Sequence, residues 1–241
     1  MDCSIVDPTW DPLRTLLRPL AVPTALAQVW AVELTAAQAL TCLAHNALSG
    51  AERALVAAAL RPSAQQRRRL TLALTRIALA DILGVPADSL ALLRHDRQAP
   101  TLPHTVPLYW SVSHSNDWFL LAWSRQVRLG VDVEFCKQNR QFGPLAELML
   151  RPEERAQFSA VAPTDQVEAF YAMWTAKEAL LKAHGLTLAD GLAAMRVRCE
   201  KAGTVAAVQP GETLYSLPVA PDYAATLALL MPPCYATPTS V

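Results

Sequence analysis

The stretch Gly-Val-Asp-Val-Glu at residues 130–134 is the most informative part of the sequence. Alternate side chains of a β-strand share one face, so Asp132 and Glu134 point the same way while Val131 and Val133 enter the core. Two adjacent carboxylates repel each other unless a cation or a shared proton lies between them, and a hard divalent ion is the usual partner. The alternative is a half-exposed strand with two solvated acids.

Further strands and helices are expected on both sides of this stretch. Strand-like runs at 109–114 and 118–123, followed by 127–135, predict an antiparallel meander, and closing strands are expected at 195–199 and 224–231. A first strand is expected at 29–34, and helices at 52–60, 65–83 and 166–184, while residues 1–27 show no clear period. This order predicts an α+β protein with two α+β units.

The stretch Trp-Thr-Ala-Lys-Glu-Ala-Leu-Leu-Lys at residues 174–182 lies within the last predicted helix. Trp174, Glu178 and Lys182 are four residues apart and form one stripe on that helix. The stripe offers a third carboxylate ligand and a cation for a phosphate group. The alternative is an ordinary Glu–Lys pair on a solvated helix surface.

Two further groups of residues could bind anions. Ser113 and His114 lie at the end of a predicted strand, where adjacent side chains point to opposite faces and are poorly placed to act as a nucleophile and base. A histidine that only caps a turn is the alternative. Arg69 and Arg76, seven residues apart on a predicted helix, share a face and could contact one anion.

Composition restricts the possible partners. The 241 residues are 52% hydrophobic and 17% charged, with 21 basic and 21 acidic side chains, so no global field favours nucleic acid or an anionic membrane. We expect neither export nor a membrane span, because residues 1–4 are not a basic region followed by an apolar stretch and the longest charge-free window, 34–51, carries polar side chains. Its five cysteines are scattered without a Cys-x-x-Cys pair, which is typical of reduced thiols. We therefore expect a cytoplasmic protein.

The order and spacing of these motifs resemble the 4′-phosphopantetheinyl transferase superfamily, in its long, pseudodimeric type that includes surfactin-synthetase-activating enzymes. The resemblance covers roughly residues 69–192 and rests on the stretches at 130–134 and 174–182 with Ser-His-Ser at 113–115. It implies two similar α/β subdomains, expected at 1–125 and 126–241, with coenzyme A held in the cleft between them.

The resemblance also implies a reaction. Members of this type move the 4′-phosphopantetheine arm of coenzyme A onto a serine of an acyl, peptidyl or polyketide carrier protein, with Mg²⁺, and release adenosine 3′,5′-bisphosphate. Asp132, Glu134 and Glu178 match the Mg²⁺ ligands, and Lys182 matches a catalytic lysine that contacts the pyrophosphate. Glu178 is the expected general base, and Glu153 is the second choice. A monomer is expected.

The remaining expected contacts are to coenzyme A. Ser113 and His114 match phosphate contacts of the family, and Arg69 and Arg76 lie in its basic first-motif region. The sequence departs from the family at Gln-Ala-Pro, residues 98–100, where a Gly-Lys-Pro or Gly-Arg-Pro is common, so one cation for the 3′-phosphate is missing there. Ser111 stands where an asparagine is common.

Two other functions are compatible with parts of the sequence. A different two-carboxylate metal enzyme, such as a phosphodiesterase or nuclease, would use the same acids, but the neutral net charge and the absence of a basic, aromatic-studded surface are against a nucleic-acid substrate. A catalytically degenerate module that binds coenzyme A or a carrier protein is the second alternative. The intact set of three acids and Lys182 is against it.

Overall fold

The computed structural model describes residues 10–92, 101–103, 106–138, 142–201 and 203–231. Gln-Ala-Pro at 98–100, where the sequence departs from the family pattern, lies outside these residues. The chain divides into two compact groups. One consists mainly of Trp30–Val106 with Asp117–Leu121, and the other mainly of Ala122–Val241 with Leu20–Val29 and Pro107–Asn116. The boundary expected at residue 125 stays a prediction.

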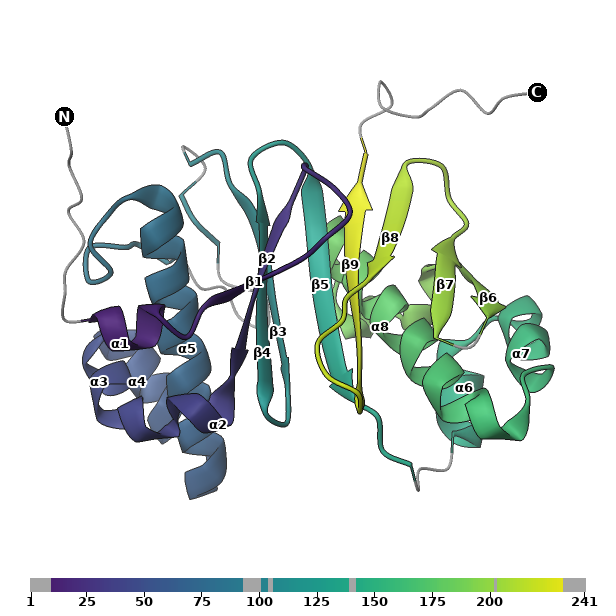
Figure 1. Cartoon of the computed structure of the whole chain (residues 1–241), viewed down its shortest axis with the longest axis horizontal. Coiled ribbons are helices and arrows are strands. Elements are labelled where there is room, and N and C mark those ends of the chain that lie inside the picture. Colours follow the sequence, from purple (N-terminus) through teal and green to yellow (C-terminus); the bar gives the residue numbers. More distant parts are fainter. Residues whose placement is uncertain (1–9, 93–100, 104–105, 139–141, 202, 232–241) are drawn as a thin grey trace. The chain divides into compact units, whose positions relative to one another are not determined.

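The first half of the chain contains four strands and several helices (Figure 1). In chain order these are α1 (Asp11–Arg14), β1 (Arg18–Leu20), β2 (Gln28–Glu33), α2 (Leu34–Ala37), η2 (Gln38–Leu40), α3 (Thr41–Asn46), α4 (Gly50–Ala57), α5 (Pro62–Leu83), β3 (Tyr109–Ser115) and β4 (Trp118–Ser124). The four strands form one sheet in the order β1-β2-β4-β3.

Helix α5 is the long helix expected at 65–83. Pro62 is tolerated at its first position, because the N–H that proline lacks would have no partner within the helix there. Gly84 ends the helix with a left-handed φ of 67°. Its buried side includes Leu70, Leu74 and Ile77. The helix therefore has the apolar face that the periodicity predicts, and it packs against α3 and α4.

The second half of the chain contains one long helix and two small sheets. Its elements are β5 (Arg128–Phe135), α6 (Gly143–Met149), α7 (Pro152–Ser159), η3 (Pro163–Asp165), α8 (Gln166–His184), η4 (Leu188–Asp190), η5 (Leu192–Ala194), β6 (Val197–Lys201), β7 (Thr204–Ala207), β8 (Glu212–Ser216) and β9 (Tyr223–Leu230). One sheet has the order β5-β9-β8 and the other is the β6-β7 hairpin.

Helix α8 packs on β5 and β9, and Figure 1 shows it lying along this sheet. Its buried side chains, among them Phe170, Met173 and Leu180, form the core of this half together with Met149. Burial of such side chains is the main favourable contribution to folding. The α+β class is confirmed, as are the helices expected at 65–83 and 166–184.

The antiparallel meander expected at 109–135 is wrong in its last strand. β3 and β4 lie next to each other, but β5 leaves that sheet and pairs antiparallel with β9, with Asp132 opposite Thr226. The apolar run of β9 supplies a neighbour that lies about ninety residues away along the chain. Strands β7 and β8 and the short elements α1 and β1 were not expected. Among the described residues, none of the helices is long and apolar enough to span a membrane.

Candidate active site

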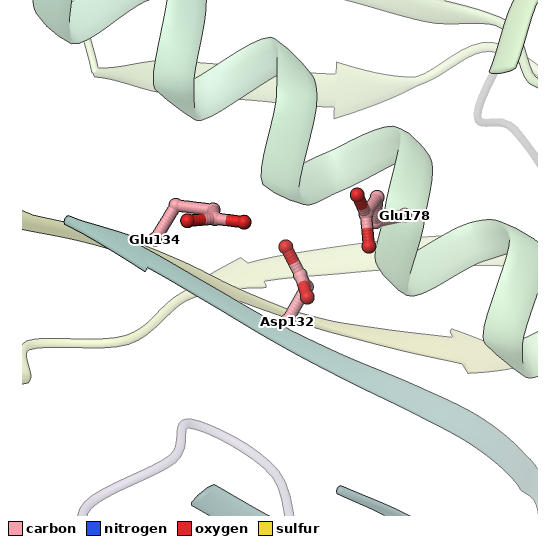
Figure 2. A group of neighbouring side chains, drawn as sticks. All are labelled: Asp132, Glu134 and Glu178. Carbon is pink, nitrogen blue, oxygen red and sulfur yellow. The ribbon is translucent and has the colours of Figure 1, made fainter. Parts of the chain in front are cut away.

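Three carboxylates converge between strand β5 and helix α8 (Figure 2). The alternation of β5 puts Asp132 and Glu134 on one face of the strand, and Glu178 faces them from α8. One oxygen of each carboxylate lies within 4.8 Å of the others. Asp132 is 2% exposed, whereas Glu134 and Glu178 are half-buried. The arrangement places three acids at the distance at which they can share one cation.

Gly130 allows helix and strand to come this close. A Cβ atom at this position would collide with the carbonyl oxygen of Ala179 and lie 2.8 Å from the Cβ of Lys182. Only glycine fits there, because every other residue would push α8 away from β5. The glycine that begins the Gly-Val-Asp-Val-Glu stretch thus sets the separation between the two elements that carry the acids.

Lys182 contacts the acid cluster directly. Its Nζ donates to Oδ1 of Asp132 at 2.7 Å and to the carbonyl oxygen of Val131 at 3.0 Å. The Lys182 side chain is 30% exposed, so its ammonium group is not buried in the core. The helical spacing of Glu178 and Lys182 therefore brings an acid and a cation to the same carboxylate.

Serine hydroxyls on β3 hold the other side of the acid cluster. Ser113 Oγ donates to Asp132 Oδ1 at 2.7 Å, and Ser115 Oγ donates to Glu134 Oε2 at 2.7 Å. The two serine Oγ atoms also accept backbone N–H groups of β5: Ser113 accepts from Val133 at 3.4 Å, and Ser115 accepts from Phe135 at 3.1 Å. Side chains of β3 thus take the place of a backbone ladder along this edge of β5.

The electrostatics of the cluster favour binding of a divalent cation. Burial, followed by repulsion from Asp132, raises the pKa of Glu178 to about 7, and Lys182 opposes this shift. Oδ2 of Asp132 is buried and, among the described residues, has no hydrogen-bond partner. A buried carboxylate oxygen without a partner is costly. Carboxylate oxygens are the ligands that a hard cation such as Mg²⁺ prefers, so the residues fit the expected ion.

The expected anion contacts are distributed differently. Ser113 points into the acid cluster, whereas His114 is exposed. Arg69 is half-buried on α5, and its Nε has no hydrogen-bond partner among the described residues. The structure places both arginines on α5, but Arg76 is buried, which the spacing of the two residues does not predict.

Arg76 is buried and bound within its own part of the chain. It is 3% exposed, pairs with Glu52 at 3.0 Å, and donates to the carbonyl oxygens of Ala87 and Leu90 at 2.7 and 2.8 Å. These contacts are those of an arginine that joins α5 to α4 and to the segment after Gly84. The expectation of a coenzyme A contact at Arg76 is therefore not supported by its surroundings.

Glu153, the second choice for a general base, lies on the surface. It is exposed at the start of α7 and pairs with Arg151 at 3.0 Å. Its own backbone N–H and then Arg151 lower its pKa. Its neighbour Glu154 is 1% exposed and pairs with the fully buried Lys177 at 2.7 Å. The lysine of the Lys-Glu-Ala motif is therefore bound in the core, while the glutamate beside it reaches the acid cluster.

Two features of the site were not predicted from the sequence. One is the contact of Ser115 with Glu134, and the other is the position of strand β9 next to the strand that carries Asp132 and Glu134. Thr226, which is opposite Asp132, contacts Thr175 of α8 at 2.9 Å between their hydroxyl oxygens. Both threonines also line a pocket of about 330 Å³, whose lining includes Cys136, Glu168, Val205 and other residues of the second half. A signal for Ser115 was present, since Ser111, Ser113 and Ser115 repeat with the same period of two as Gly130, Asp132 and Glu134.

Comparisons with known proteins agree with this geometry. One family model matches residues 128–228, which contain the three acids and Lys182. That family is the 4′-phosphopantetheinyl transferase superfamily. The resemblance found in the motifs is thereby confirmed at the level of the superfamily, and the matched region covers β5 through most of β9.

Curated relatives carry the same description. The 4′-phosphopantetheinyl transferase AcpT of Escherichia coli is 34% identical over 86 residues, which are 36% of this chain and 44% of that protein. The 4′-phosphopantetheinyl transferase of Bacillus subtilis is 26% identical over 137 residues, 57% of this chain and 60% of that protein. The 4′-phosphopantetheinyl transferase HetI of a Nostoc species is 28% identical over 134 residues, 54% and 55% of the two chains. The match thus spans less than half the length of the E. coli relative.

Proposed function

We propose that this protein transfers the 4′-phosphopantetheine arm of coenzyme A to a serine of an acyl, peptidyl or polyketide carrier protein, with Mg²⁺, and releases adenosine 3′,5′-bisphosphate. One observation carries the proposal: Asp132, Glu134 and Glu178 converge within 4.8 Å, with Lys182 on Asp132, inside the region that matches the transferase superfamily. The protein would act in the cytoplasm as a monomer with two similar subdomains, at 1–125 and 126–241. It would bind neither nucleic acid nor a membrane.

The three carboxylates would hold the ion. A bound Mg²⁺ would neutralise charge on the pyrophosphate oxygens as the reaction proceeds. Asp132 offers its buried Oδ2, while its Oδ1 is already occupied by Ser113 and Lys182. Lys182 is partly exposed, so its ammonium group can bind a pyrophosphate oxygen beside the cluster.

Transfer requires a proton to leave the carrier serine. The serine oxygen forms a bond to the β-phosphorus, the bond from that phosphorus to the bridging oxygen breaks, and the bridging oxygen leaves with adenosine 3′,5′-bisphosphate. Glu178 is the proposed acceptor of the proton, because its half-buried carboxylate faces Asp132 and Glu134 from α8 and lies within the cluster where the phosphate would bind. Glu153 is a weaker candidate, because it is exposed, paired with Arg151 and held at a lowered pKa.

A pocket whose lining includes Thr226, the residue opposite Asp132 on β9, offers space for the pantetheine arm. It lies on the α8 side of the β5-β9-β8 sheet, shares Thr175 and Thr226 with the surroundings of Asp132, and mixes hydroxyl groups with apolar side chains such as Val205 and Leu214. An arm of amides and methylene groups needs such a lining. We expect Val205→Trp to raise the KM for coenzyme A several-fold while leaving the affinity for adenosine 3′,5′-bisphosphate, which lacks the arm, unchanged.

The decisive experiment measures the intact mass of purified apo carrier proteins after incubation with this protein, coenzyme A and Mg²⁺. We expect a mass gain of one phosphopantetheine group that EDTA prevents. Glu178→Gln should abolish the gain, and Glu147→Gln, an exposed carboxylate on α6, should not. Binding of coenzyme A without any mass gain across several carrier proteins would instead support the alternative of a catalytically degenerate binding module.

A further inference from the structure

We infer that Ser113 and Ser115 are positioning residues for the metal-binding carboxylates. The inference rests on the proposed function for its metal ion and concerns how this chain prepares the site. Each serine hydroxyl lies 2.7 Å from a carboxylate oxygen of the cluster, Ser113 on Asp132 and Ser115 on Glu134.

The direction of each hydrogen bond is fixed by the backbone of β5. A serine hydroxyl carries one proton and can accept other hydrogen bonds, whereas a backbone N–H can only donate. Val133 N–H donates to Ser113 Oγ and Phe135 N–H donates to Ser115 Oγ, so each hydroxyl accepts from the strand and donates its single proton to the carboxylate. Such a chain of hydrogen bonds strengthens each member.

This chain determines which carboxylate oxygen is offered to a ligand. Ser113 and Lys182 both donate to Oδ1 of Asp132, and the other oxygen, Oδ2, is the buried atom without a hydrogen-bond partner among the residues described. Two donors on Oδ1 fix the rotation of the carboxylate, so Oδ2 has one direction only. Outer contacts of this kind orient metal ligands and tune their affinity.

The repeat along the strand provides a matched control. Nineteen residues separate Ser113 from Asp132 and Ser115 from Glu134, and the same separation leads from Ser111 to Gly130, which has no side chain. Ser111 is 8% exposed, close to the 9% of Ser113, and accepts the N–H of Val131 at 3.1 Å. Ser111→Ala therefore removes the same support for β5 without touching a carboxylate.

The test measures the dissociation constant for Mn²⁺, used as the probe ion, by isothermal titration calorimetry without coenzyme A. We expect Ser113→Ala and Ser115→Ala each to raise it by about tenfold, and Ser111→Ala to change it by less than about twofold. Ser115→Thr, which keeps the hydroxyl, should restore the affinity. Thermal unfolding of each variant checks folding, and if Ser113→Ala unfolds, the half-buried Ser115 still decides the outcome.

A parallel titration with coenzyme A in EDTA separates this role from a phosphate contact. Unchanged coenzyme A affinity in Ser113→Ala supports positioning, whereas weaker coenzyme A binding with unchanged Mn²⁺ affinity overturns it. Equal effects of all three alanine variants, or no Mn²⁺ binding by the wild-type protein in the millimolar range, also overturn it. Because neither titration needs a carrier protein, a failure of the transferase proposal appears separately, as wild-type protein that binds Mn²⁺ and transfers nothing.

Discussion

Burial, followed by repulsion from Asp132, raises the pKa of Glu178 from 4.5 to about 7. In the unfolded chain the carboxyl group loses its proton near pH 4.5, but in the folded chain it keeps it to about pH 7. Raising the pH through this range therefore favours unfolding. We predict that in EDTA the protein loses roughly 2 kcal/mol of stability between pH 5 and pH 8.

Thermal unfolding at the two pH values measures this loss. Glu178→Gln, which cannot ionise, should remove most of the pH dependence, and Mg²⁺ should restore the stability of the wild-type protein at pH 8 because it binds the folded state. A wild-type protein equally stable at both pH values, or a Gln variant with the same loss, would show that Glu178 is not the group responsible.

Arg76 has a structural role in its surroundings, and its replacement tests this. Arg76→Met leaves the carboxylate of Glu52, whose side chain is 2% exposed, buried without its guanidinium partner. Breaking such a pair from one side costs about 3 kcal/mol, so a large loss in urea unfolding is expected. Arg67→Met, on an exposed position of the same helix, should stay within about 0.5 kcal/mol.

The binding of coenzyme A distinguishes the two possible roles of Arg76. Calorimetric titration of the folded Arg76→Met variant should give the wild-type affinity. A loss of coenzyme A affinity without a loss of stability would instead support the coenzyme A contact at Arg76 that the family resemblance implies.

Single-residue roles were predictable where local geometry alone decides them. The period of two in β5 and the four-residue spacing in α8 correctly predict that Asp132 shares a face with Glu134, and Glu178 with Lys182. The same logic paired Arg69 with Arg76, but helical spacing does not say which face is buried. The partner of Ser113 depends on β3 lying beside β5, which no local pattern contains.

At the scale of elements, the contact between β5 and α8 depends on the missing side chain of Gly130. Gly130→Ala would place a methyl group against the backbone of Ala179 and the Cβ of Lys182, so helix and strand must separate. We predict a loss of about 2 to 3 kcal/mol in the free energy of unfolding. We also expect weaker Mn²⁺ binding, since Glu178 moves away from Asp132.

A second glycine in the same half provides the comparison. A methyl group on Gly143, at the first position of α6, would have nothing within 4 Å, so Gly143→Ala should not destabilise the protein. Urea unfolding and Mn²⁺ titration of both variants measure the difference. If Gly130→Ala unfolds at the wild-type urea concentration, close packing at this glycine does not control the site.

Element boundaries were predicted better than element partners. The long helices and most strands are found near their expected positions because periodicity, proline and glycine determine them locally. The placement of β5 was wrong because a short turn between strands favours hairpin pairing, whereas here β5 pairs with the distant strand β9. The serines of β3 then accept the N–H groups on the other edge of β5, so the switch of sheets leaves these groups hydrogen-bonded.

At the scale of the whole molecule, the balance of 21 basic and 21 acidic side chains means that binding of a polyanion depends on local cations. The three acids, Lys182 and both positioning serines all belong to one chain and to one of its compact groups. No residue of a second copy is needed to build this cluster from the described residues. We therefore predict that the protein acts as a monomer.

Light scattering after size-exclusion chromatography should give a mass near 26.2 kDa, with and without coenzyme A, over a wide range of protein concentration. The rate of carrier modification per chain should not change with enzyme concentration, because a site held by one chain does not depend on association. A measured mass of two chains with a constant rate per chain would show that the protein dimerises, but that its activity does not depend on the second copy. A rate per chain that rises together with dimer formation would contradict it in substance, since the second copy would then contribute to the site.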